Sequence, residues 1–231
     1  MPAVSGAEST CWTVIRDAAG GDGGARTQLV TAYTPVIRAY LAARWRTSPL
    51  RGSVDDAVQD VFLACFRDGG ALERADPELP GGFRAFLYGI VRNIARETER
   101  RSARRQARRL ESALGDDGVA ADDASLSRVF DRAWAVALMR EAAEAQRRAA
   151  EAAGPDAVRR VELLRLRFHD GLPIRDIAAR WGDDPARVHR EYAKARTEFQ
   201  DALVAVLTFH HPRPRPQALD EARRLLGLLG E

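Results

Sequence analysis

The sequence predicts an all-α protein made of two small helical domains that are joined by an acidic linker. Three observations support this fold class. Apolar residues recur at helical spacing along almost the whole chain, strand-like alternation around tight turns is absent, and breaks rich in Gly or Pro divide the chain into helix-sized pieces. The 231 residues are enough for one domain or two small ones.

Three helices are expected in the first domain. The first spans about residues 25–45. The second runs from Ser53 to about Asp68, and its early acidic residues favour a helix N-terminus. The third begins near Phe83, after a loop over residues 69–82 that is rich in Gly and Pro. The apolar residues expected to form the core face of this third helix are Phe83, Phe86, Leu87, Ile90, Val91 and Ile94.

Charge is distributed unevenly along the chain, although the formal net charge is only +3. Every basic residue except Lys194 is Arg, a bias that a GC-rich genome also produces. Residues 92–109 hold eight Arg and two acidic residues, whereas residues 111–131 hold six acidic residues and one Arg. The acidic stretch has little apolar content and no periodicity, so we predict a linker over residues 110–127.

The Arg-rich stretch is a candidate nucleic-acid surface. Its Arg residues recur at i, i+4 spacing from Arg92 to Arg104, a stripe suited to following DNA phosphates. Two aromatic residues, Phe86 and Tyr88, lie just upstream, and exposed aromatic rings can stack on unpaired bases. The alternative is that Phe86 belongs to the core and the Arg residues form a solvated face.

The second predicted domain, residues 128–209, contains the most specific pattern. Residues 174–181 are expected to form a short helix, residues 182–184 a turn and cap, and Pro185 the start of a second helix. Two helices around a short turn that contains Gly predict a helix-turn-helix, whose second helix can enter a major groove. An ordinary helical hairpin is the alternative. The outward-facing cationic residues of the second helix are Arg187, Arg190 and Lys194.

Three segments, in this order, resemble the motifs of bacterial extracytoplasmic-function (ECF) sigma factors. Residues 56–63 (DAVQDVFL) resemble the core-polymerase-binding motif of sigma region 2, and residues 83–95 (FRAFLYGIVRNIA) resemble the promoter-melting segment that follows it. Residues 163–172 (LLRLRFHDGL) and 177–190 resemble sigma region 4. The resemblance covers most of residues 12–207.

The resemblance implies a sigma factor that binds core RNA polymerase and promoter DNA and directs transcription initiation. Residues 1–109 would be region 2 and residues 128–209 region 4, while the linker would follow the RNA-exit path. Residues 210–231 would hold a Pro-rich segment and a C-terminal helix, which packs on the second domain or receives a partner. The residues implied are Asp56, Gln59 and Asp60 for polymerase binding, Phe86, Tyr88, Asn93, Arg96, Arg100 and Arg101 for the −10 element, and Arg187, Arg190 and Lys194 for the −35 element.

Two positions depart from the family pattern. Glu191 lies in the predicted recognition helix where a basic residue is usual, so it either accepts from a cytosine amino group or weakens −35 binding. Phe86 lies where Trp is common. Residues 130–134, together with the His-Pro segment and the Leu-rich terminal helix, resemble a planctomycete-type subgroup. Restraint by an anti-sigma factor, by the C-terminal helix or by a regulatory kinase is open.

Competing functions use the same fold differently. A sigma-like regulatory adaptor would bind polymerase without directing initiation, and a stand-alone helix-turn-helix repressor would bind duplex DNA without polymerase. We expect no enzyme activity, since no catalytic constellation is discernible, and no cofactor. His210 and His211 lack further ligands at metal spacing. The two Cys residues, the lack of a secretory signal and the short apolar runs predict a cytoplasmic protein with no membrane partner.

Overall fold

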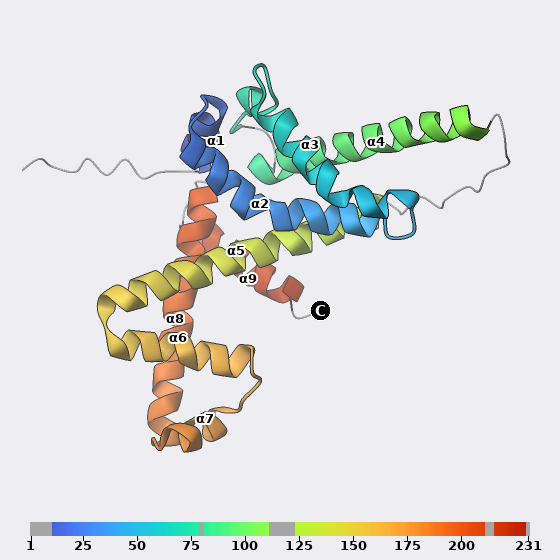
Figure 1. The fold of residues 1–231 in the computed structure, drawn as a ribbon. Helices are drawn as coiled ribbons and strands as arrows, with labels where there is room; N and C mark the ends of the chain where they lie inside the picture. Colours follow the sequence, from blue (N-terminus) through green and yellow to red (C-terminus); the bar gives the residue numbers. More distant parts are fainter. Residues whose placement is uncertain (1–10, 79–80, 111–122, 211–214, 230–231) are drawn as a thin grey trace, which may run out of the picture. The chain divides into compact units, whose positions relative to one another are not determined.

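The computed structural model describes residues 11–78, 81–110, 123–210 and 215–229 (Figure 1). These residues form helices and turns and contain no strand, which confirms the all-α prediction. They divide into two compact units, Met1–Ala137 and Leu138–Glu231. Within the described ranges, no helix has both the length and the apolar character needed to cross a membrane.

Where the first unit is described, it contains four α-helices and the first half of a fifth. Two short 3-10 helices, η1 (Pro49–Ser53) and η2 (Leu72–Arg74), lie between them. The α-helices of this unit are α1 (Cys11–Ala19), α2 (Gly23–Arg44), α3 (Val54–Phe66), α4 (Gly82–Leu110) and the first half of α5 (Asp123–Ala153). The three helices expected in this domain are therefore present as α2, α3 and α4, and α1 was not predicted.

Local chemistry explains where α2 begins and which side of α4 is buried. The Asp22 carboxylate accepts a hydrogen bond from the backbone N–H of Ala25 at 2.6 Å, a side-chain cap of α2. On α4, the fully buried row repeats every fourth residue. Its members are Phe83, Leu87, Val91 and Ala95. The predicted core positions Phe86, Ile90 and Ile94 are only half-buried, because each lies on the neighbouring side of the helix, three residues after a member of the buried row.

The first half of α5, residues 123–137, belongs to the first unit. Figure 1 shows it running beside α2. Its Trp134 ring stacks on Tyr33 with centroids 5.1 Å apart, and its Phe130 ring meets the edge of Tyr88 at 5.2 Å. The predicted boundary at residue 128 therefore differs from the boundary between the two units at residue 137. The reason is that burial of Phe130 and Trp134 draws this segment onto α2 and α4.

The second unit begins with the remainder of α5. Its other helices are α6 (Pro155–Phe168), α7 (Ile174–Trp181), α8 (Pro185–His210) and α9 (Arg215–Leu229). One cluster of buried residues joins α6, α7 and α8, namely Leu163, Leu166, Ile177, Ala178 and Val188. The terminal helix α9 packs on α8 and buries Ala218 and Ala222, so packing is the arrangement that this helix adopts.

Candidate nucleic-acid interface

The residues predicted to bind polymerase lie on one side of α3. Asp56 and Gln59 are exposed and Asp60 is half-buried. Leu63 lies three residues after Asp60, on the same side of α3. Its side chain is 66% exposed although it is large and apolar. We call these four residues the α3 stripe. Leu63 was not predicted as a site residue. Two features of the sequence could have identified it: its i+7 spacing from Asp56 and its absence from the predicted core face.

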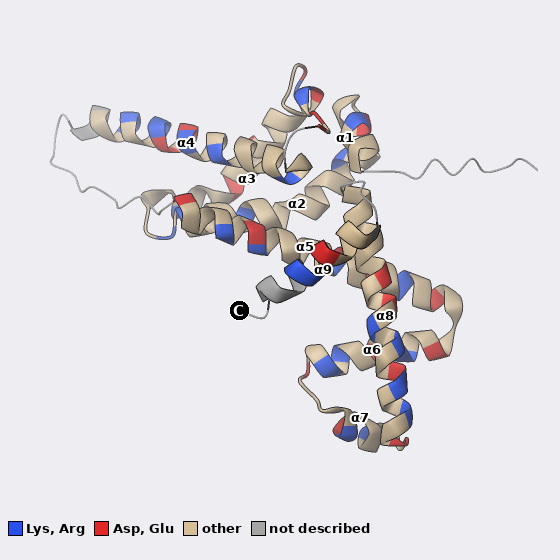
Figure 2. Ribbon diagram, turned by 180° about the vertical axis from the view of Figure 1, so that it is seen from behind, with Lys and Arg blue, Asp and Glu red and all other residues tan. Residues whose placement is uncertain are grey.

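Figure 2 shows basic residues at intervals along α4, and the residues predicted to contact the −10 element differ in their exposure on this helix. Asn93, Arg100 and Arg101 are exposed, whereas Tyr88 and Arg96 lie toward the first half of α5 and are half-buried. The stacking of both aromatic residues on unpaired bases stays a prediction, and the ring of Tyr88 lies against Phe130 of α5 in the described fold. Phe86 is also half-buried and its ring centroid lies 6.0 Å from that of Phe83.

Three guanidinium groups converge on the carboxylate of Asp123, the first residue of α5. Arg92 donates to its Oδ2 at 2.5 Å and Arg96 at 3.3 Å, while Arg44 lies 3.5 Å from its Oδ1. The hydrogen bond from Arg92 and the positive charges of all three Arg residues hold the pKa of Asp123 below its ordinary value. A second acidic residue of this segment, Asp131, pairs with Arg84.

Arg44 is held in place by a second carboxylate. Glu99 accepts from the Nε of Arg44 at 2.7 Å, from its Nη2 at 2.9 Å and from the indole N–H of Trp45 at 2.8 Å. The Arg44 side chain is only 11% exposed. Burial opposes ionisation of Glu99, but these hydrogen bonds outweigh it and lower the pKa of Glu99. Arg44 belongs to no motif in the sequence, so it was not predicted as a site residue.

Arg92 keeps a donor that Asp123 does not satisfy. Among the described residues, its Nε is the one buried side-chain nitrogen or oxygen atom that has no hydrogen-bond partner. A buried unsatisfied donor costs about 1–3 kcal/mol in proteins. The cluster of Arg44, Arg92 and Arg96 therefore holds more donor capacity and more positive charge than Asp123 alone satisfies.

In the second unit, the turn between α7 and α8 forms as predicted. Gly182 ends α7 in the left-handed conformation with φ of 61°, which favours Gly. The Asp184 carboxylate then accepts from the backbone N–H groups of Ala186 and Arg187, both at 3.2 Å. Pro185 occupies the first position of α8. The side chains predicted to face DNA, Arg187, Arg190 and Lys194, are all exposed.

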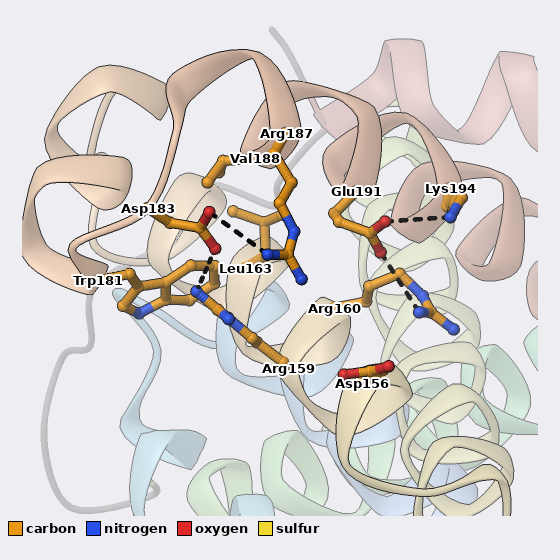
Figure 3. Close-up of a pocket in the computed structure, with 10 residues that line it drawn as sticks. All are labelled: Asp156, Arg159, Arg160, Leu163, Trp181, Asp183, Arg187, Val188, Glu191 and Lys194. Carbon is orange, nitrogen blue, oxygen red and sulfur yellow. Dashed lines mark hydrogen bonds and ion pairs between the residues drawn. The ribbon is translucent and has the colours of Figure 1, made fainter.

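A pocket between α6, α7 and α8 shows where Glu191 points (Figure 3). Its carboxylate accepts from Arg160 of α6 at 3.4 Å and from Lys194 at 3.0 Å. Hydrogen bonds from Lys194 and Arg160 lower the pKa of Glu191. Arg160 also binds Glu198 at 2.7 Å. Glu191 is therefore half-buried and connects α6 to α8, and the expectation that it reads a base loses its geometric support.

Other cations of the same pocket also have acidic partners. Arg159 lies 4.4 Å above the ring of Trp181 and donates to Asp183 at 2.8 Å, and Arg187 lies 3.8 Å from Asp183. These pairs leave little uncompensated charge inside the pocket. Arg187 and Lys194 are exposed but line this pocket and pair with Asp183 and Glu191, while Arg190 is exposed on α8 outside the pocket.

The comparisons with known proteins assign no family to the chain. No protein-family model matches the chain, and a search of curated proteins finds no significant match. Within the described ranges, no three His, Cys, Asp or Glu side chains gather as a metal ion would require. The Nε2 of His210 lies 2.8 Å from a carboxylate oxygen of Glu141, while His211 falls outside the described residues.

Proposed function

We propose that the chain is an ECF-type sigma factor, which binds core RNA polymerase and directs promoter recognition and transcription initiation. The observation that carries the proposal is the pair of helices α7 and α8. A capped turn at Gly182 and Asp184 joins them, and exposed cationic residues follow directly on the second helix. This arrangement fits a helix-turn-helix whose second helix enters the major groove at the −35 element.

The cationic face of α8 has the chemistry that such a contact needs. Arg187 and Arg190 each offer a planar guanidinium that can donate two hydrogen bonds to guanine, or bind a phosphate. Lys194 supplies a point charge one turn further along the helix. The sequence specificity of −35 binding would therefore depend mainly on the two Arg residues.

The α3 stripe supports the polymerase-binding half of the proposal. It combines three polar side chains, two of them acidic, with one exposed apolar side chain, and a protein interface commonly pairs an apolar contact with a polar rim. In this proposal Leu63 is the apolar anchor, while Asp56, Gln59 and Asp60 orient the helix on the polymerase surface. The catalytic chemistry belongs to the polymerase, and the chain supplies promoter recognition.

The adaptor alternative loses its motivation. Its basis was the acidic Glu191 in the recognition helix, which would repel DNA phosphates. Because Glu191 pairs with Arg160 and Lys194, its charge is compensated within the protein. Arg187 and Arg190 remain exposed on α8 and supply the positive charge that promoter binding requires.

Co-elution with sigma-free core polymerase tests the proposal. We expect the full chain to co-elute in size-exclusion chromatography, and the variant Asp56→Arg/Asp60→Arg to lose this association. A matched variant, Asp17→Arg/Asp68→Arg, makes the same change of charge at exposed positions outside the α3 stripe and should still co-elute. The reconstituted holoenzyme should then initiate at discrete sites on genomic DNA of the source organism, with shared −10 and −35 sequences upstream.

Other results identify the competing functions. Co-elution without discrete start sites would indicate a regulatory adaptor. Tight binding of duplex DNA by the chain alone, together with an unchanged elution profile in the presence of polymerase, would indicate a repressor. Equal loss of association in both double variants would mean that the α3 stripe is not the polymerase-binding surface.

A further inference from the structure

We infer that Arg44, Arg92 and Arg96 form a binding site for a backbone phosphate of single-stranded DNA, and that Asp123 occupies this site in the closed chain. This inference rests on the proposed function and extends it, because it adds Arg44 and Arg92 to the predicted −10 surface. It also makes the first half of α5 a competitor of the DNA strand.

The geometry of the three guanidinium groups fits a tetrahedral oxyanion. They come from two helices, α2 and α4, and reach both carboxylate oxygens of Asp123. Planar guanidinium groups bind phosphate and carboxylate through the same donors, so a carboxylate can take the place of a phosphate. Glu99 fixes Arg44 from behind, so that this part of the site is preformed.

The charge balance favours exchange of Asp123 for a stronger anion. Asp123 and Glu99 supply two negative charges against the three positive charges of Arg44, Arg92 and Arg96. The Nε of Arg92 has no acceptor while Asp123 is in place. The Asp123 side chain is itself 46% exposed and lies on the first residue of its helix, where few backbone contacts hold it.

The same segment covers an aromatic ring beside the site. Tyr88, which the sequence analysis assigned to an unpaired base, meets the edge of Phe130 at 5.2 Å and of Tyr40 at 5.7 Å. Phe130 lies seven residues after Asp123, about 10 Å along the helix. That length is about three stacked nucleotides at ~3.4 Å each. The first half of α5 thus presents a carboxylate and an aromatic ring where a DNA strand would present a phosphate and a base.

A strand can bind here only after the first half of α5 has moved away. The measured affinity for single-stranded DNA is then reduced by the fraction of molecules that are closed. Weakening the contact of Asp123 should raise the open fraction and tighten DNA binding. Removing an acidic residue that does not hold the segment should act only through the general electrostatic field.

The test uses the full chain and a fluorescein-labelled 12-nucleotide single-stranded DNA, followed by fluorescence anisotropy. We expect Asp123→Asn to tighten binding by about threefold to tenfold. The matched variant is Asp68→Asn, which makes the same change of charge at an exposed position after α3, away from the Arg residues assigned to DNA. It should change the affinity by less than about twofold. Adding Arg44→Gln to Asp123→Asn should reverse the gain.

Two further readouts separate release of the segment from general electrostatics. For Asp123→Asn, the plot of log affinity against log salt concentration should steepen by about 0.7 for each additional phosphate that the freed guanidinium groups neutralise. Hydrogen exchange over residues 126–137 should accelerate in this variant without DNA, and in the wild type when DNA is added.

Equal effects of Asp123→Asn and Asp68→Asn would overturn the inference, as would DNA binding that leaves exchange over residues 126–137 unchanged. Failure of every variant to bind the oligonucleotide would overturn it as well. None of these measurements involves polymerase. If the DNA measurements give the expected results but the chain does not co-elute with polymerase, the phosphate site stands and the proposed sigma function is wrong. If the chain co-elutes but the DNA measurements fail, the sigma function stands and the phosphate site is wrong.

Discussion

Replacing Glu191 reverses or removes a charge at the point where α6 and α8 meet. The Arg160 side chain that it binds is only 17% exposed, whereas Lys194 is exposed. Exposed or partly exposed ion pairs contribute about 0.2–1 kcal/mol each, so Glu191→Gln should cost about 1 kcal/mol of stability. Glu191→Arg adds repulsion, which for unit charges 4 Å apart ranges from about 1 kcal/mol in water to about 4 kcal/mol at an effective dielectric constant of 20.

The long side chain of an introduced Arg can turn into solvent, so we take the lower end of that range. The expected total for Glu191→Arg is then about 2 kcal/mol. Native-state hydrogen exchange over α6 and α8 measures this quantity. Exchange should accelerate about fivefold for Glu191→Gln and about 30-fold for Glu191→Arg, since about 1.4 kcal/mol corresponds to a factor of ten. Ala193→Arg, on the exposed side of α8, is the control and should leave exchange unchanged.

One outcome would refute this reasoning. If Glu191→Arg left the exchange of α6 and α8 at its wild-type rate but altered the preferred −35 sequence, the carboxylate would face DNA rather than Arg160. The helix would then read DNA with Glu191 in the way that the sequence first suggested.

Three more predictions concern the first unit. Because the folded state lowers the pKa of Glu99, the stability that Glu99 contributes is present above about pH 4.3 and is lost as the pH falls through the folded value. Urea unfolding between about pH 3 and pH 7 should show that Glu99→Gln costs about 2 kcal/mol at pH 7 and little at the acidic end. Burial raises the pKa of the Cys65 thiol to about 12, so Cys65 should resist iodoacetamide at pH 8 until the chain unfolds. A Cβ at Gly70 would lie 2.4 Å from a backbone oxygen, whereas one at Gly69 would meet nothing within 4 Å. Gly70→Ala should therefore lower the thermal midpoint more than Gly69→Ala, which carries only the cost of a positive φ of about 1–2 kcal/mol.

Local sequence chemistry was enough to predict the second unit's turn. Gly182 tolerates the left-handed conformation that ends α7, and Pro185 has the fixed φ that suits the first position of α8. Asp184 supplies the cap in the predicted way. These features depend on residues a few positions apart, so no knowledge of the tertiary structure was needed.

The start of α5 and the Arg44 cluster depended on residues far apart in the chain. An acidic stretch with low apolar content is typical of a linker, but Phe130 in the following turns finds its partners on α2 and α4. Arg44 lies 55 residues from Glu99 and belongs to no periodic pattern. Helical periodicity identifies which side of a helix is apolar, but it does not identify the helix that covers it, and for this reason the contact of Tyr88 with Phe130 was not predicted.

Because Lys194 is the only lysine in the sequence, its side chain can be modified separately from every other cationic side chain. It carries the only side-chain amine of the 231-residue chain, it is exposed, and it donates to Glu191. Acylation of lysine side chains, by an enzyme or by a reagent, therefore has one target here and would remove one positive charge from the exposed face of α8. The guanidinium groups of Arg44, Arg92 and Arg96 would be untouched by the same chemistry. A label attached to the lysine side chain would thus report on α8 alone.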